Sequence, residues 1–374
     1  MSLDLNKYMQ ELETLVNMDS GSRFPAGTKR VADFFVEKFE KIGWLVEVVH
    51  TSDAVGPCLK ICNRQADTYD LLFIGHMDTV FPEGTVAQRP FKVEGDRAYG
   101  PGVIDMKSGL LYAYYVAEEL TEANALQDKN ICIIFNPDEE ISSVHSRKLI
   151  EQTAVNCRHA IVLEPARANG GTVKIRKGIS KYFIDFHGKA AHAGVDPENG
   201  ASAVDELCKW VLDLNQFRSE ETGTSVNAGV ISGGTAPNVV ADHAQVQIDV
   251  RMRVIEEAEK FDARVRELAA KPFDPRVKID VKGGLTRPPL NNPEGNAKLF
   301  VLLEDAAQEL GIKIEWVATG GGSDGNFTSA LGVPTLDTLG PIGGLGHGVG
   351  EYMEISSVVP RFKLLMGVVN RILK

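Results

Sequence analysis

Four short runs of apolar residues constrain the fold of this chain more than any other feature of its sequence. They cover residues 71–74, 131–135, 160–163 and 334–336. A strand that is apolar on both faces belongs in the middle of a sheet that helices cover from both sides. The four runs therefore predict the central strands of a buried, mostly parallel sheet.

Segments with helical spacing of apolar residues separate these runs. The spacing is found at residues 8–15, 31–42, 106–120, 299–310 and 362–372. Alternation of helices and strands along a chain is typical of α/β proteins. We therefore expect an α/β fold with a mixed, mostly parallel central sheet flanked by helices.

The middle of the chain has a different pattern, in which apolar and polar residues alternate strictly. This alternation predicts antiparallel strands with one packed and one solvated face, and amphipathic helices fall between them. The alternating stretches are residues 182–186 and 246–252, and the helices are residues 204–214 and 261–268. The sequence thus predicts an inserted two-layer α+β domain over residues 176–288, within a discontinuous domain made of residues 1–175 and 289–374.

The charge balance argues against two classes of partner. The chain has 40 Lys and Arg residues against 51 Asp and Glu residues, which gives a net charge of −11. A phosphate backbone or an anionic membrane surface would be repelled by this excess of acid. The apolar runs are also far shorter than the roughly 20 residues that a membrane span needs. We therefore expect neither nucleic acid nor a membrane as a partner.

The N-terminal segment and the cysteines favour a cytoplasmic location. Asp4, Glu11 and Glu13 interrupt the region in which a signal peptide would need a continuous apolar stretch. The five cysteines are scattered and odd in number, as expected of free thiols in a reducing compartment.

Acidic and imidazole side chains follow the ends of the predicted strands, and a further acid precedes a predicted helix. In chain order they are His76, Asp78, Asp105, Glu139, Glu140 and Glu164. Ligands of open α/β sheets bind at the carboxyl ends of the strands. Histidine and carboxylates are ligands of zinc, manganese and cobalt. The sequence therefore predicts a metal site at this edge of the sheet.

Two spacings favour a metal site over simpler interpretations of these residues. The simpler interpretations are a loop histidine at His76 and a helix N-cap at Asp105. Asp78 lies two residues after His76, where its carboxylate could fix the orientation of a ligating imidazole. Glu139 and Glu140 are adjacent, and two such carboxylates repel each other unless a cation or a proton lies between them. One can bind metal while the other takes a proton from water.

A second enzyme class is also compatible with the sequence. Residues 321–325 satisfy the G-x-S-x-G pattern around Ser323, and Asp337 and His347 follow in the order of a serine hydrolase triad. Against this hypothesis, the acids at the strand ends would have no role. The preceding Gly320 suggests instead a row of backbone N–H groups that binds an anion, or a plain glycine-rich turn.

The sequence resembles the two-metal aminoacylase/carboxypeptidase family, which includes bacterial glutamate carboxypeptidase, acetylornithine deacetylase and succinyl-diaminopimelate desuccinylase. The motifs GHMDTV, YGPGVIDMKSG, NPDEE, VLEP and GLGHG carry the resemblance, in order, over nearly the whole chain. The resemblance implies a metal-bridging Asp105 and a catalytic Glu139 supported by Asp78. The further metal ligands that it implies are His76, Glu140, Glu164 and His347.

The inserted segment resembles the lid, or dimerisation, domain of that family. Its motifs GKAAHAG, GGTAPNVV and DVRMR place a catalytic histidine at His192, an asparagine at Asn238 and a substrate-carboxylate arginine at Arg251. The motif TGGGSD resembles the loop that meets the substrate carboxylate, which implies substrate contacts from Gly321, Gly322 and Ser323. The resemblance also implies a homodimer through this domain, with His192 acting either at the site of its own chain or at that of a partner subunit.

Three positions depart from the family pattern. Ser142 and His145 stand where the family usually has glycines, two and five residues after the second glutamate, and Ser108 replaces another common glycine. The turn after the glutamate pair is therefore expected to differ, and His145 is a candidate neighbour of the metals.

The residues and the resemblance together predict a metal-dependent hydrolase with two divalent ions, zinc first and cobalt or manganese as alternatives. The expected substrate is a small peptide or N-acyl amino acid, cleaved at the amide next to a free carboxylate by a glutamate carboxypeptidase-like exopeptidase. Alternatives are an N-acyl amino acid deacylase, a dipeptidase, a serine hydrolase using Ser323, and a non-catalytic metal or peptide binder.

Overall fold

The computed structural model describes residues 3–374, which form two compact units. Unit 1 runs to Lys174 and resumes over Asn292–Ala318 and Ser323–Lys374; unit 2 comprises Ile175–Asn291 and Thr319–Gly322. Each unit has its own hydrophobic core. Among residues 3–374, the helices are all too short or too polar to cross a bilayer.

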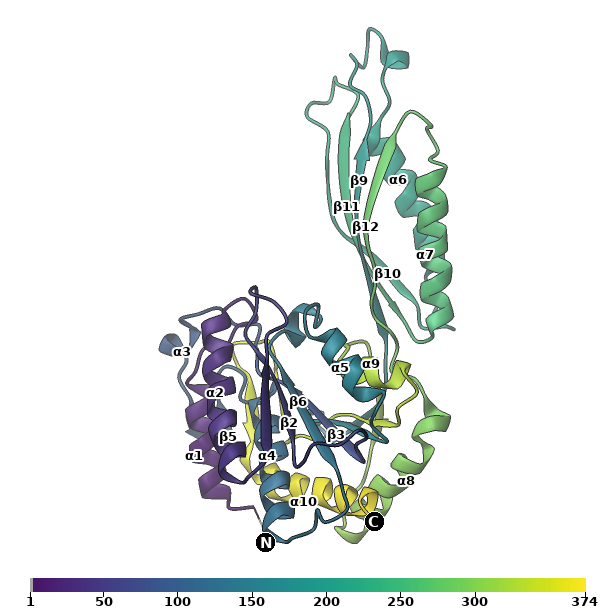
Figure 1. The fold of residues 1–374 in the computed structure, drawn as a ribbon. Coiled ribbons are helices and arrows are strands. Elements are labelled where there is room, and N and C mark those ends of the chain that lie inside the picture. Colours follow the sequence, from purple (N-terminus) through teal and green to yellow (C-terminus); the bar gives the residue numbers. More distant parts are fainter. Residues whose placement is uncertain (1–2) are drawn as a thin grey trace. The chain divides into compact units, whose positions relative to one another are not determined.

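The centre of unit 1 is a six-stranded mixed sheet (Figure 1). In spatial order its strands are β1 (Leu45–Val49), β2 (Cys58–Cys62), β6 (Ile131–Asn136), β3 (Leu71–His76), β7 (Ala160–Val162) and β14 (Thr335–Leu336). Strands β6, β3, β7 and β14 are parallel, and β1 and β2 add an antiparallel edge. The predicted α/β class with a mostly parallel central sheet is confirmed, and the four apolar runs supply its parallel strands.

Helices cover both faces of this sheet because successive strand residues point to opposite sides. In β3, Leu71 and Phe73 join the core beneath helices α1, α2, α4, α8 and α10, whereas Leu72 and Ile74 face α5 and α9. The helices are α1 (Leu5–Val16), α2 (Pro25–Lys41), α4 (Lys107–Glu122), α5 (Arg147–Ala154), α8 (Pro293–Glu309), α9 (Gly325–Ala330) and α10 (Ile355–Ile372), with a short α3 (Thr85–Gln88).

Small elements of unit 1 complete the surroundings of the sheet edge. A second, antiparallel sheet has the order β15 (Gly343–Gly344), β16 (Tyr352–Glu354), β5 (Arg97–Tyr99) and β4 (Lys92–Glu94). Strand β8 (Thr172–Arg176) pairs with β13 (Trp316–Thr319), and a 3₁₀ turn, η1 (Glu139–Ile141), follows β6. In the second sheet, β16 near the C-terminus pairs with β5, which precedes Asp105. The two strands are far apart in sequence.

Unit 2 is a four-stranded antiparallel sheet with two helices against one face (Figure 1). The spatial order is β10 (Ser225–Gly233), β11 (His243–Met252), β9 (Gly178–His187) and β12 (Lys278–Arg287). The helices are α6 (Ala203–Leu214) and α7 (Ile255–Ala270), with 3₁₀ turns η2 (Pro197–Asn199) and η3 (Asn215–Phe217). Tyr182, Ile184 and Phe186 on β9 point into this core, on the face that their alternation indicates.

Candidate functional site

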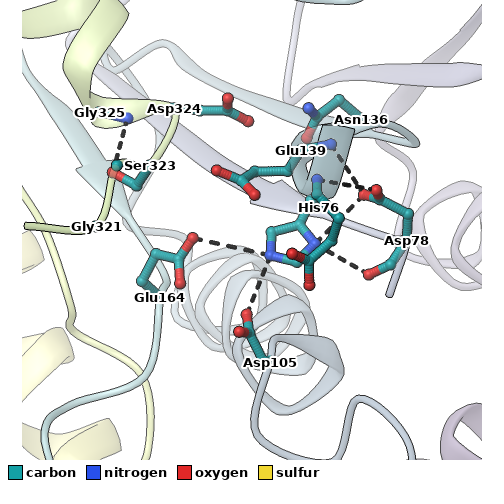
Figure 2. A network of polar contacts seen from close by, with 12 residues as sticks. His76, Asp78, Asp105, Asn136, Glu139, Glu164, Gly321, Ser323, Asp324 and Gly325 are labelled. Atoms are coloured by element: carbon teal, nitrogen blue, oxygen red, sulfur yellow. Dashed lines mark hydrogen bonds and ion pairs between the residues drawn. The ribbon is translucent and has the colours of Figure 1, made fainter. Parts of the chain in front are cut away.

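Polar side chains gather where the parallel strands of unit 1 end (Figure 2). His76 is the last residue of β3, η1 begins three residues after β6, and Glu164 follows β7 by two residues. Asp105 lies just before α4, and His347 comes from the segment between β15 and β16. The fold thus brings together residues that are up to 271 positions apart, 76 to 347, at one edge of the sheet.

The five predicted metal ligands form two groups that share one aspartate. In the first, the Nε2 atom of His76 lies 3.2 Å from Oδ1 of Asp105 and 3.8 Å from Oε1 of Glu164. In the second, Nε2 of His347 lies 3.2 Å from Oδ2 of Asp105 and 2.9 Å from Oε2 of Glu140. Within each group the ligand atoms all lie within 4.8 Å of one another. The two oxygens of Asp105 therefore face different groups.

The chemistry of this donor set fits divalent cations. Burial raises the pKa of Glu140 to about 8, despite the hydrogen bond from His347. Hydrogen bonds to Asp105 and Glu140 raise the pKa of His347 to about 11. Oε1 of Glu140 is buried and has no hydrogen-bond partner in residues 3–374. A buried carboxylate oxygen without a donor is costly, and a metal ion satisfies it. The residues present thus fit two ions, one in each group.

Asp78 holds both the histidine and the glutamate turn in place. Its Oδ1 and Oδ2 atoms accept the backbone N–H groups of Glu139 and Glu140, each at 3.1 Å, and Ser22 donates its hydroxyl at 2.6 Å. Nδ1 of His76 lies 3.0 Å from the backbone carbonyl oxygen of Asp78 and 3.4 Å from its Oδ1. Asp78 is fully buried. These contacts leave Nε2 of His76 turned toward Asp105 and Glu164.

Solvent reaches the site from the side of His347. The side chain of His347 is 54% exposed, whereas that of His76 is 2% exposed. Glu139 is partly exposed in η1, next to the more deeply buried Glu140. A substrate can therefore approach the shared edge of the two groups without unfolding the sheet.

In the turn after the glutamates, serines adopt backbone angles that favour glycine. Ser142 has φ +77° and Ser143 has φ +52°, in the left-handed region that favours glycine. The backbone N–H of His145 donates to Oδ2 of Asp138 at 2.7 Å. His145 belongs to neither group of candidate metal ligands found among residues 3–374. Two serines thus adopt left-handed geometry in this turn.

The predicted catalytic histidine and asparagine lie in unit 2. His192 and Asn238 are exposed, on the loops that follow β9 and precede β11. The N–H of Ala193 donates to the carbonyl oxygen of Asn238 at 3.0 Å, and His192 forms a bridge with Val239. The structure therefore brings these two predicted residues together within unit 2, whereas the candidate metal ligands belong to unit 1.

The predicted carboxylate-binding arginine already holds an acid of its own strand. Nε and Nη2 of Arg251 lie 2.6 Å and 2.9 Å from the two carboxylate oxygens of Asp249, and Nη1 donates to the carbonyl of Gly320 at 3.3 Å. A substrate carboxylate on Arg251 would have to share or replace this bidentate pair.

Arginine side chains that the sequence did not single out hold the glycine loop. Nη1 of Arg176 donates to the carbonyl oxygens of Gly321 and Gly322, at 3.3 Å and 3.0 Å. A Cβ atom on Gly322 would lie 2.8 Å from Cδ of Arg287, so glycine is needed for this approach. Arg176 and Arg287 are buried at the ends of β8 and β12. The sequence offered one signal for these two arginines, since each is a basic residue at the end of a strand.

The serine hydrolase hypothesis is wrong. Ser323 is fully buried, and its hydroxyl donates directly to Oδ2 of Asp337 at 2.6 Å. His347, which the hypothesis needs between them, instead lies against Asp105 and Glu140. The three residues follow one another in the expected order along the chain, but the fold does not assemble them into a triad.

Comparisons with known proteins agree with this geometry. Residues 72–371 match Peptidase family M20/M25/M40. The chain is 31% identical over 368 residues to carboxypeptidase G2 from Pseudomonas sp. (strain RS-16), covering 94% of this chain and 86% of that protein. It is 26% identical to succinyl-diaminopimelate desuccinylase from Cupriavidus necator, covering 81% and 82%.

A solved structure shows the same fold at lower identity. The crystal structure of aminopeptidase PepT from Bacillus cereus ATCC 10987 superposes with a TM-score of 0.80 at 23% identity, covering 100% of both chains. The resemblance on which the metal ligands were predicted is therefore confirmed at the level of family. The chain belongs to Peptidase family M20/M25/M40 and is a metal-dependent hydrolase.

Proposed function

We propose that the protein is a two-metal exopeptidase that cleaves the amide bond next to a free carboxylate and releases glutamate. One observation carries the proposal: two ligand groups share Asp105, with Glu139 beside the ligand Glu140. The relative at 31% identity is named a carboxypeptidase, which favours this activity over deacylation. Zinc is the proposed metal, since histidine and carboxylates are its usual ligands at catalytic sites.

When bound, the two ions supply Lewis acidity and lower the pKa of water. Glu139 is the proposed general base, which takes a proton from the attacking water and gives it to the leaving amine. The backbone N–H of Glu139 donates to Asp78, and this hydrogen bond fixes the position of the backbone that carries the Glu139 side chain. Asp78 thus acts on both His76 and the base, and it serves as a positioning residue.

Unit 2 is proposed to supply the groups that bind the substrate. Arg251 is the proposed partner of the terminal carboxylate, and Gly321 and Gly322 are further proposed contacts from unit 2. The third predicted contact of this loop, Ser323, is buried in unit 1. His192 is proposed to stabilise the oxyanion, and Asn238 to contact the substrate. The hydrogen bond between Ala193 and the carbonyl of Asn238 supports a joint role for their two loops.

A pocket in unit 1 is the proposed site for the acyl side of the substrate. It has a volume of about 440 Å³, and Glu140 forms part of its wall. Phe24 and Phe81 line it with aromatic surface, and the exposed cation Arg23 lies at the same pocket. Aromatic rings next to a cation suit a flat or partly anionic acyl group, which is why N-acyl glutamates with aromatic acyl groups lead our list of substrates.

A homodimer through unit 2 in the cytoplasm is part of the proposal. Strand β10 is an edge of the sheet, and Val230 and Ile231 on it are 53% and 55% exposed. An exposed apolar edge strand favours pairing with another chain. The free cysteines, all buried except Cys208, support a reducing compartment.

The proposed function is tested by incubating the zinc-loaded protein with pteroyl-glutamate, N-benzoyl-glutamate, N-acetylornithine and simple dipeptides. We expect glutamate release from the aromatic acyl-glutamates and loss of turnover in strong chelator. Preferred turnover of N-acetylornithine would favour the deacylase, and preferred turnover of dipeptides the dipeptidase. Two bound ions without hydrolysis of any compound would contradict the proposal and favour a non-catalytic binder.

A further inference from the structure

A buried glutamate outside both ligand groups holds the loop that carries Asp105. Glu351 is 1% exposed and lies just before β16. Its Oε2 atom accepts the backbone N–H of Gly102 at 3.0 Å. Its Oε1 atom accepts those of Ile104 and Asp105, at 3.0 Å and 3.1 Å. Three donors from one loop thus converge on a single carboxylate.

Core packing and a second buried side chain also hold this loop, since Val103 and Ile104 are buried in the core of unit 1. Residues 100–105 lie between β5 and α4 and form turns rather than a strand or helix. Gly100 and Gly102 have positive φ angles, so the loop follows a path that a regular element could not provide. The ammonium of Lys107 is also buried and donates to the carbonyls of Met18 and Pro101, at 2.7 Å and 3.4 Å. The loop is therefore held from both ends by side chains.

Glu351 also joins the two segments that meet at the second ligand group. It lies four residues after His347, and its backbone N–H donates to the carbonyl of Gly348 at 3.3 Å. Its carboxylate binds the segment of Asp105. A Cβ atom on Gly346 would lie 3.2 Å from Oδ2 of Asp105, so the two segments approach closely beside the ligands themselves. The carboxylate of Glu351 thus links the segment of Asp105 to the segment that follows His347.

We propose that Glu351 is a positioning residue for the metal site: it fixes the shared ligand Asp105 relative to His347 and so sets the affinity for the ion held by Asp105, Glu140 and His347. The inference rests on the proposed two-metal function. Glutamine is nearly the same size but presents an NH₂ group to one set of backbone donors, whichever way its amide is turned. Glu351→Gln therefore disturbs the loop without removing a metal ligand.

Unit 2 offers a matched control. Glu206 is also 1% exposed, and its carboxylate also accepts three N–H groups: those of Phe273 and Asp274, both at 2.9 Å, and the indole N–H of Trp210 at 3.0 Å. Glu206→Gln makes the same chemical change in a part of the chain that holds no candidate metal ligand. A purely structural role for Glu351 predicts that the two variants behave alike.

The experiment compares wild type, Glu351→Gln, Glu206→Gln and the shorter acid Glu351→Asp as full-length chains. Stripped of metal, each is titrated with Co²⁺ against a chromophoric chelator, and its thermal unfolding is followed. Both glutamine variants are expected to unfold at lower temperature. Only Glu351→Gln is expected to bind one of its two ions about 10–100-fold more weakly, the usual effect of losing a group that orients a ligand. Glu351→Asp, which keeps the charge, is expected to fall between wild type and glutamine.

Wild-type affinity for both ions in Glu351→Gln would overturn the inference, as would an equal loss of affinity in Glu206→Gln. If Glu351→Gln does not fold, Glu351→Asp decides, because wild-type affinity for both ions in that variant contradicts the inference. The proposed function fails separately. A wild-type chain that binds fewer than two ions overturns both the proposed function and this inference, whereas wild-type affinity for both ions in every variant overturns the inference alone.

Discussion

The hydrogen-bond partners of a buried glutamate in unit 2, Glu206, differ from those of the acids that follow β6 in unit 1. In unit 2, Glu206 lies in the core with three N–H donors on its oxygens, so its charge is fully used to hold a helix against a loop. In unit 1, buried oxygens of Asp138 and Glu140 have no hydrogen-bond partner in residues 3–374, and both acids follow the same strand. A buried polar atom without a partner destabilises a fold. At Glu140, which belongs to a candidate ligand group, a bound cation would supply the missing partner.

The largest expected effect comes from the base. Glu139→Gln removes the group that accepts the proton, and general-base catalysis contributes about 10²–10⁴-fold to a rate. We therefore expect kcat to fall by that factor for the best acyl-glutamate, with two ions still bound and no loss of thermal stability. Steady-state kinetics with metal analysis checks this. Full turnover in the variant would remove Glu139 from the mechanism.

Removal of the metals is expected to affect the two units unequally. Binding to the folded state alone stabilises it by about 2.7 kcal/mol when the ion is at 100 times its Kd. The candidate ligands all belong to unit 1, so chelation should lower the protection of amides in β3, β6 and β7 from hydrogen exchange, and leave β9 and β11 of unit 2 unchanged. Equal loss of protection in both units would show that the metals do not belong to unit 1 alone.

The smallest expected effect comes from the turn after the glutamates. Ser142 adopts φ +77°, where a residue with a Cβ atom costs about 1–2 kcal/mol. Glycine removes this strain but gains freedom in the unfolded chain, worth about 0.4–1 kcal/mol. Ser142→Gly should therefore raise the free energy of unfolding by about 0–1.6 kcal/mol. Chemical denaturation measures it, with Ser142→Ala as the control that keeps the Cβ atom; a loss of stability with glycine would contradict the account of this turn.

Local patterns in the sequence predicted the sheet of unit 1 well. The apolar runs at residues 71–74 and 131–135 are strands because both of their faces are buried, which periodicity alone can indicate. The ends of these runs then located His76 and the glutamate pair, since ligands of such sheets lie at strand ends. This part of the site could be predicted because it depends on short-range order.

Long-range contacts were beyond the reach of such patterns. Glu351 contacts a loop almost 250 positions earlier, and no spacing in the sequence connects the two. The hydrogen bonds from Arg176 to the glycine loop, about 145 positions later, are of the same kind. The triad suggested around Ser323 was wrong for the converse reason, since His347 follows in the expected order but contacts Asp105 and Glu140 instead. Interactions of this sort follow from the tertiary fold.

The most direct test of the central claim is a crystal structure of the zinc-loaded protein with an anomalous difference map measured at the zinc absorption edge. The account predicts two peaks in unit 1, one beside His76 and Glu164 and the other beside Glu140 and His347, with Asp105 between them. A single peak, or peaks away from Asp105, would contradict it.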